Sequence, residues 1–126
     1  MNKARKIGLL AFVVLSIGFI QSCKNKEPSA IKIFVRSASN ELVQGAKVII
    51  IGDVNSNPPT LSHVDTVLTN SSGFAVFEMK AYYEAAGESN SVGYFDVIVK
   101  SGTKQAEGRV RSRAHTTAVE TIYLPN

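Results

Sequence analysis

Hydrophobic and polar residues alternate along most of the chain beyond residue 29, which is the pattern of β-strands with one buried face. Residues 31–36 place isoleucine or valine at every second position, and residues 46–51 form a β-branched run suited to a central strand. Further strands are predicted at 64–68, 75–79, 94–100, 105–113 and 117–124. The side chains expected to face the core are Ile31, Ile33, Val35, Ala75, Phe77, Met79, Phe95, Val97 and Val99.

Turns separate these strands at near-regular intervals. Residues 40–45 and 70–73 each end in a glycine, which is free to take a positive φ. Residues 53–60 contain two prolines and cannot form a central strand, because proline lacks the backbone N–H donor. The pattern predicts an all-β fold, a seven-stranded antiparallel Greek-key β-sandwich. The absence of long helical stretches argues against parallel βαβ units.

A single short helical turn is predicted near 80–86. Its apolar side chains recur at spacings of three and four, and Gly87 is placed to end the helix. These side chains are Met79, Tyr82, Tyr83 and Ala86.

The chain begins with a different pattern. Three basic residues precede an uncharged stretch at 7–20, which ends shortly before Cys23, the only cysteine. A charged start, a short apolar middle and small residues before a cleavage point are typical of a secretory signal peptide. The stretch is too short to span a bilayer, which needs about 20 apolar residues. A lone cysteine in an exported protein has no internal disulfide partner.

The motif Ile20-Gln21-Ser22-Cys23 resembles the lipobox of bacterial lipoproteins of the Bacteroidetes type, although Ile20 and Gln21 depart from its commonest form. The resemblance implies that Cys23 is lipidated and becomes the first residue of an envelope protein anchored to the membrane. Lys24 favours the outer membrane, with the periplasmic and surface faces both open. The alternative is an ordinary signal peptide followed by a free cysteine. The predicted organisation is a signal peptide at 1–22, a lipidated tether at 23–29 and a β-sandwich domain at 30–126.

Removal of the signal peptide changes the charge of the protein. The whole chain has 14 basic and 10 acidic residues, for a formal charge of +4. Residues 1–22 contain three of the basic residues and none of the acidic ones, so the mature chain carries about +1. The charge therefore gives no support for nucleic-acid binding.

The sandwich segment resembles a known domain family. Leu42-Val43-Gln44-Gly45-Ala46-Lys47-Val48 and the hairpin Thr69-Asn70-Ser71-Ser72-Gly73-Phe74-Ala75-Val76-Phe77 are similar to motifs of carboxypeptidase-regulatory-like, or transthyretin-like, Greek-key domains. Bacterial Ig-like domains share the hairpin. One transthyretin-like branch contains hydrolases of small ureides that end in Tyr-Arg-Gly-Ser. This chain ends in Tyr123-Leu124-Pro125-Asn126, so the resemblance does not extend to that activity.

No catalytic or metal-binding constellation is evident in the sequence. His63 and Asp65 share a strand face and are expected to be a solvent-facing polar pair, while Ser62 points the opposite way and lacks a nucleophile elbow. His115 is expected in a surface loop. There is no paired cysteine, no His-x-x-x-His motif and no calcium-type loop. We expect a protein that is not an enzyme and has neither cofactor nor metal.

Two groups of side chains are candidates for ligand binding. Arg109, Arg111 and Arg113 alternate along one strand, so their guanidinium groups project from one face and suit an acidic glycan or lipopolysaccharide. A solvated face, or protection of an edge strand from aggregation, is the alternative. The second group is tyrosines, which suit sugar stacking or protein contacts and equally the rim of the core. It comprises Tyr82, Tyr83 and Tyr94.

The sequence favours a lipid-anchored envelope protein that presents one β-sandwich as a non-catalytic binding or scaffolding module. The partner would be the membrane, through the lipid, together with a glycan polymer or an envelope protein, and not nucleic acid. Two alternatives stay open. One is a small enzyme or enzyme-accessory subunit that uses His63 and Asp65. The other is a structural spacer or adhesin subunit.

Overall fold

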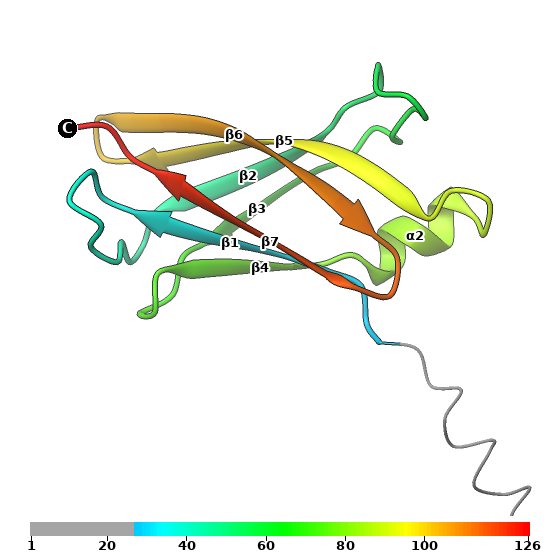
Figure 1. Ribbon diagram of the computed structural model, residues 1–126, viewed down its shortest axis with the longest axis horizontal. Coiled ribbons are helices and arrows are strands. Elements are labelled where there is room, and N and C mark those ends of the chain that lie inside the picture. The colour runs from blue at the N-terminus through cyan, green and yellow to red at the C-terminus, as the bar shows by residue number, and fades with distance from the viewer. Residues whose placement is uncertain (1–26) are drawn as a thin grey trace, which may run out of the picture.

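Two β-sheets enclose one hydrophobic core in the computed structural model of the chain, which describes residues 27–126 (Figure 1). The predicted signal peptide and Cys23 lie outside the described residues. The strands are β1 (Ala30–Arg36), β2 (Lys47–Gly52), β3 (Val64–Leu68), β4 (Phe74–Glu78), β5 (Val92–Ser101), β6 (Lys104–Arg113) and β7 (Thr117–Tyr123). One helix, α2 (Lys80–Ala86), lies between β4 and β5.

The strands form a three-stranded sheet, ordered β4-β1-β7, and a four-stranded sheet, ordered β3-β2-β5-β6. The predicted all-β sandwich is therefore confirmed. One pairing differs from the antiparallel expectation, because β1 and β7 run parallel, from Ala30 beside Thr117 to Arg36 beside Tyr123. β7 follows the antiparallel β6 and lies in the opposite sheet, where it joins β1 in the same direction (Figure 1).

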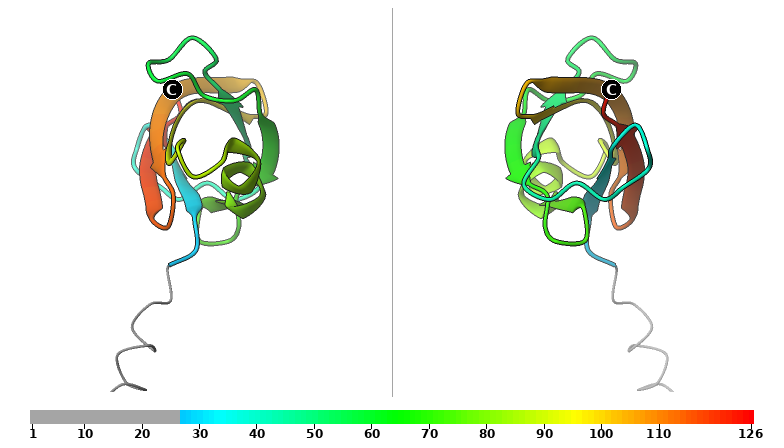
Figure 2. Two further views of the ribbon diagram at one scale, coloured as in Figure 1. Left: turned by 90° about the vertical axis from the view of Figure 1, so that its right-hand side faces the viewer. Right: turned by 90° about the vertical axis from the view of Figure 1, so that its left-hand side faces the viewer.

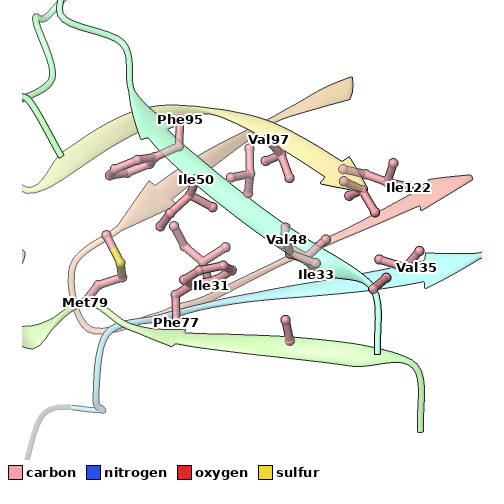
Figure 3. Packing of buried hydrophobic residues seen from close by; sticks show 14 of the residues in the cluster. Ile31, Ile33, Val35, Val48, Ile50, Phe77, Met79, Phe95, Val97 and Ile122 are labelled. Carbon is pink, nitrogen blue, oxygen red and sulfur yellow. The ribbon is translucent and has the colours of Figure 1, made fainter. Parts of the chain in front are cut away.

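Alternating apolar side chains from both sheets fill the space between them (Figure 3). The inward set predicted from β1, β4 and β5 is confirmed, since each of these side chains is at most 1% exposed. Phe77 is 1% exposed, and Phe95 from the other sheet is completely buried. End-on views show both sheets curving around this core, with α2 at one end (Figure 2).

The predicted turns and helix also form. Gly45 and Gly73 take φ values of 76° and 77°, as the turn signals required. The backbone N–H of Gly87 donates to the carbonyl oxygen of Tyr83 at 3.1 Å and closes the last turn of α2. The helix thus places Tyr82 over the open end of the core.

The orientation of β3 corrects one expectation. Val64 and Leu68 point outward and are 66% and 59% exposed, so the opposite face of the strand turns toward the core. The His63 ring packs edge-on against Tyr82 and Phe95, with centroid distances of 5.3 and 6.1 Å. The prediction of a solvent-facing His63 was wrong, because this strand face is the one directed toward the aromatic end of the core.

Candidate functional site

A polar hollow of about 620 Å³ opens beside the outer face of β5 and β6. We call it the Tyr94 hollow, after its aromatic side chain. Its walls come from the loop after β2, from β5 and β6, and from β7. The lining residues are Asp53, Asn55, Ser56, Asn57, Tyr94, Arg109, Val110, Arg111 and Glu120.

The register of β5 and β6 sets the floor of the hollow. Tyr94 lies opposite Arg111, and Asp96 lies opposite Arg109. Because side chains two residues apart on a strand share a face, all four project from the same side of the sheet. The inward neighbours Phe95 and Val110 are buried in the core, which fixes this orientation.

Hydrogen bonds hold the loop at 53–60 against Tyr94. The backbone N–H of Asp53 donates to the Tyr94 carbonyl at 2.9 Å, and the Tyr94 N–H donates to the Thr60 hydroxyl at 2.8 Å. Within the loop, the Ser56 hydroxyl bonds the Asp53 carbonyl at 2.8 Å and lies 2.9 Å from the Thr60 hydroxyl. With Thr60 only 3% exposed, the loop is anchored in the body of the domain. The wall of the hollow is therefore preformed.

Arg109 is neutralised by two carboxylates. Its Nη2 lies 2.6 Å from Asp53 Oδ2, and its Nε lies 3.1 Å from Asp96 Oδ1. Among residues 27–126 the other ion pair joins Lys80 and Glu84, so Arg111 makes none there. The row of three exposed cations predicted from sequence thus contains one arginine paired with carboxylates and two that form no ion pair among residues 27–126.

The charges of the lining residues balance, because Arg109 and Arg111 are matched by Asp53 and Glu120, and Asp96 beside Arg109 adds a further carboxylate. It offers guanidinium donors, carboxylate acceptors and amide groups around one tyrosine ring. An acidic polymer would meet carboxylates as well as cations. The arrangement instead suits an uncharged ligand with many hydroxyl groups.

The other predicted binding residues lie elsewhere. Arg113 is exposed on the outer face of β6, beyond the lining of the hollow. Tyr82 is 7% exposed and belongs to the core, where its hydroxyl accepts the backbone N–H of Leu61 at 3.2 Å. Tyr83 is half-buried, and its hydroxyl donates to Ser112 at 2.8 Å. Loss of hydration on burial raises the pKa of Tyr83, with smaller contributions from its neighbours.

A second hollow, of about 530 Å³, lies at the α2 end of the domain between the helix and the turn before β7. Tyr83 and His115 both line it. His115 has a φ of 62°, and its N–H donates to the Ser29 hydroxyl at 2.7 Å. Its Nδ1 lies 3.1 Å from the Glu27 carbonyl oxygen. His115 therefore sits in the predicted turn and fastens the segment that leads into β1.

Sequence reasoning missed the loop residues of the Tyr94 hollow and Glu120. Asp53 pairs with Arg109, which is 56 positions away in the sequence. The strand pattern contains no information about such a long-range contact. The one available signal was that a polar, proline-containing loop at the end of a strand often lies beside a functional surface.

His63 and Asp65, the two residues of the alternative small-enzyme hypothesis, each interact with neighbouring groups. His63 packs against core aromatics, and the Asp65 carboxylate accepts the N–H of Thr66 at 2.8 Å. Within residues 27–126, no group of three or more His, Cys, Asp or Glu side chains is arranged to hold a metal ion. In the same part of the chain, no helix has the length and hydropathy needed to cross a membrane.

Comparison with known proteins defines the fold alone. No protein-family model and no curated protein matches the sequence. Five chains of solved structures match, among them "The Bacillus anthracis TIE protein", with a TM-score of 0.53 and 14% identity. The match covers 79% of this chain and 17% of that chain. The similarity supports the β-sandwich class, and this chain spans only a small part of the other protein's length.

Proposed function

We propose that this protein is a lipid-anchored envelope lipoprotein whose β-sandwich binds a glycan without catalysis. The Tyr94 hollow carries this proposal, because it is the place where predicted binding residues and an ordered loop come together. The predicted signal peptide and the lipobox-like motif at Cys23 support the proposed envelope location. The transthyretin-like and carboxypeptidase-regulatory-like resemblance fits a module that displays a ligand surface.

The lining of the hollow favours a neutral sugar. Sugar hydroxyls both donate and accept hydrogen bonds, and they meet guanidinium donors and carboxylate acceptors within the same hollow. The Tyr94 ring supplies an apolar face for the C–H side of a pyranose. Because the loop at 53–60 is held in place by hydrogen bonds, binding would cost little ordering of the protein.

Glycan binding is tested on an array of neutral and uronic-acid polysaccharides. Replacement of Tyr94 or Arg111 by alanine should weaken binding to neutral glycans about tenfold, which corresponds to the loss of one aromatic or charged contact of about 1.4 kcal/mol. Arg113→Ala is the matched control, because Arg113 lies outside the lining, and it should leave binding unchanged. Binding restricted to uronic-acid polymers would contradict a neutral ligand. Equal losses in all three variants would contradict this site.

Anchoring is tested separately by metabolic labelling with an alkyne fatty acid. Wild-type protein should incorporate the label and partition with membranes, whereas Cys23→Ser should do neither, because the acyl chains have lost their attachment point. Protease treatment of intact cells then distinguishes the surface from the periplasmic face. An unlabelled wild-type protein would reject the anchor while leaving the glycan experiment valid.

A further inference from the structure

The outer face of the three-stranded sheet breaks the usual alternation of buried apolar and exposed polar residues. Outward positions on all three strands carry large apolar side chains, and a lysine lies among them. Val76, Val119 and Tyr123 are 42%, 54% and 56% exposed. We call this surface the Phe34–Phe74 face. It consists of Lys32, Phe34, Phe74, Val76, Val119 and Tyr123.

Strand register brings most of these side chains together, although the exposed Thr121 beside Phe34 separates Val119 from Tyr123 on β7. Lys32 lies between Val76 on β4 and Val119 on β7, and Phe34 lies opposite Phe74. The two phenylalanine rings pack with centroids 5.4 Å apart. None of these side chains is needed to fill the core, which the opposite face of the sheet already fills. Large apolar surfaces on folded domains are commonly interaction sites.

Lys32 places a positive charge within this apolar surface. Its Nζ lies 4.0 Å from the ring centroid of Phe74 and 5.0 Å from that of Phe34. Ring faces attract the ammonium charge but do not satisfy its three N–H donors as oxygen acceptors would. Among residues 27–126, Lys32 has no ion-pair partner within 4 Å. Its donors are therefore available to a carboxylate brought in by another molecule.

We propose that the Phe34–Phe74 face is a docking surface for an envelope protein that presents a carboxylate surrounded by apolar side chains. The carboxylate pairs with Lys32 between the rings, and the apolar side chains cover Val76 and Val119. Interface centres are enriched in aromatic residues and depleted of charge, which matches one lysine within an apolar field. The site lies on the outward face of the three-stranded sheet, whereas the Tyr94 hollow is built mainly on β5 and β6 and takes only Glu120 from β7. The inference rests on the proposed envelope location but does not depend on glycan binding.

Charge argues against the two other occupants. Arg36 and Glu78 lie on outward positions that border this face, and Glu78 is the only acidic residue on the outward positions of β4, β1 and β7. A second copy would therefore bring Lys32 and Arg36 against the same two cations. An anionic membrane surface attracts clusters of basic residues. Two cations offset by one carboxylate would provide little of that attraction. An acidic, apolar protein surface satisfies both the lysine and the exposed valines.

The test uses full-length protein in cells, with the photocrosslinking residue p-benzoylphenylalanine at Val76 or, as a control position, at the exposed Thr66 of the other sheet. We expect a discrete protein adduct from Val76 alone. Lys32→Glu should reduce that adduct at least tenfold by repelling the carboxylate. Lys100→Glu, a matched charge reversal on an exposed strand position of the other sheet, should leave it unchanged.

Each other result overturns the proposal. An adduct with lipid would identify a membrane surface, and an adduct with a second copy would identify self-association. No adduct, or an adduct insensitive to Lys32→Glu in protein with an unchanged melting curve, would remove the docking site. If Lys32→Glu impairs folding, Val119→Asp provides the same test from the neighbouring strand, since Val119 is exposed and pairs beside Lys32.

Discussion

At the scale of single residues, side-chain alternation predicted which side chains are buried but not which residues they contact. Phe77 was identified as a core residue because it occupies an inward position between apolar neighbours, and it is 1% exposed. Tyr82 and Tyr94 look alike in sequence, yet one closes the core and the other lines a hollow. Their difference depends on the packing of α2 and the loop at 53–60. Periodicity does not encode that packing.

Replacing Phe77 with alanine should lower the free energy of unfolding by about 3–5 kcal/mol, because the cavity forms where both sheets meet. Urea unfolding of the mature domain measures this loss. Val76→Ala is the control, since Val76 is 42% exposed on the next position of β4 and should change stability by about 0.5 kcal/mol or less. Similar losses in both variants would disprove the observed orientation of β4.

Tyr83 should make stability depend on alkaline pH. Burial raises its pKa above the ordinary value of about 10, so the neutral phenol stabilises the folded state below pH 10. That contribution is lost as the pH rises through the raised pKa. Tyr83→Phe should cost about 1 kcal/mol at pH 7, because the bond to the buried Ser112 hydroxyl disappears.

Urea unfolding of wild type and Tyr83→Phe at pH 7, 9 and 11 measures this dependence. The stability difference between the two proteins should be constant up to about pH 9 and shrink above pH 10, since the variant has no phenol to ionise. Other titrating groups are common to both proteins and cancel. A difference that stays constant to pH 11 would contradict the raised pKa.

At the scale of elements, the sequence predicted seven strands and one helical turn because their periodicities differ clearly. Strand ends agree with the prediction to within a few residues. The direction of β7 was not predictable, because an alternating strand looks the same whichever way it runs. The sequence was equally ambiguous about which face of β3 is directed toward the core, since both faces contain apolar and polar residues.

Gly52 shows how closely one element constrains another. A Cβ at this position would collide with the carbonyl oxygen of Leu61, and the Gly52 N–H donates to the His63 carbonyl at 2.8 Å. Gly52→Ala should therefore cost about 1–3 kcal/mol by forcing the backbone apart where β2 ends. Thermal unfolding monitored by circular dichroism measures the loss. Thr66→Ala, at an exposed position, provides a control. Equal melting temperatures for the two variants would show that the backbone of Gly52 packs less closely against Leu61 than described.

At the scale of the whole molecule, the sheets present two surfaces of different character. The four-stranded sheet contributes β5 and β6 to the polar, charge-balanced Tyr94 hollow, and the three-stranded sheet carries the apolar Phe34–Phe74 face. The sequence suggested the surface at the Tyr94 hollow through Arg109, Arg111 and Tyr94. It contained a sign of the second in the outward Phe34, which alternates with the core residues of β1. Taken together, the two proposals describe a domain that joins a glycan to a protein partner.

The parallel pairing of β1 with β7 has a mechanical consequence. β1 is the middle strand of its sheet, bonded along its length to β7 on one side and to β4 on the other. A pull on the segment before Ala30 acts along the axis of β1, across hydrogen bonds that lie sideways to the force. The two ladders then resist in shear, with their bonds loaded together instead of opening one after another. The strand nearest the N-terminal segment is thus also the one best placed to bear tension.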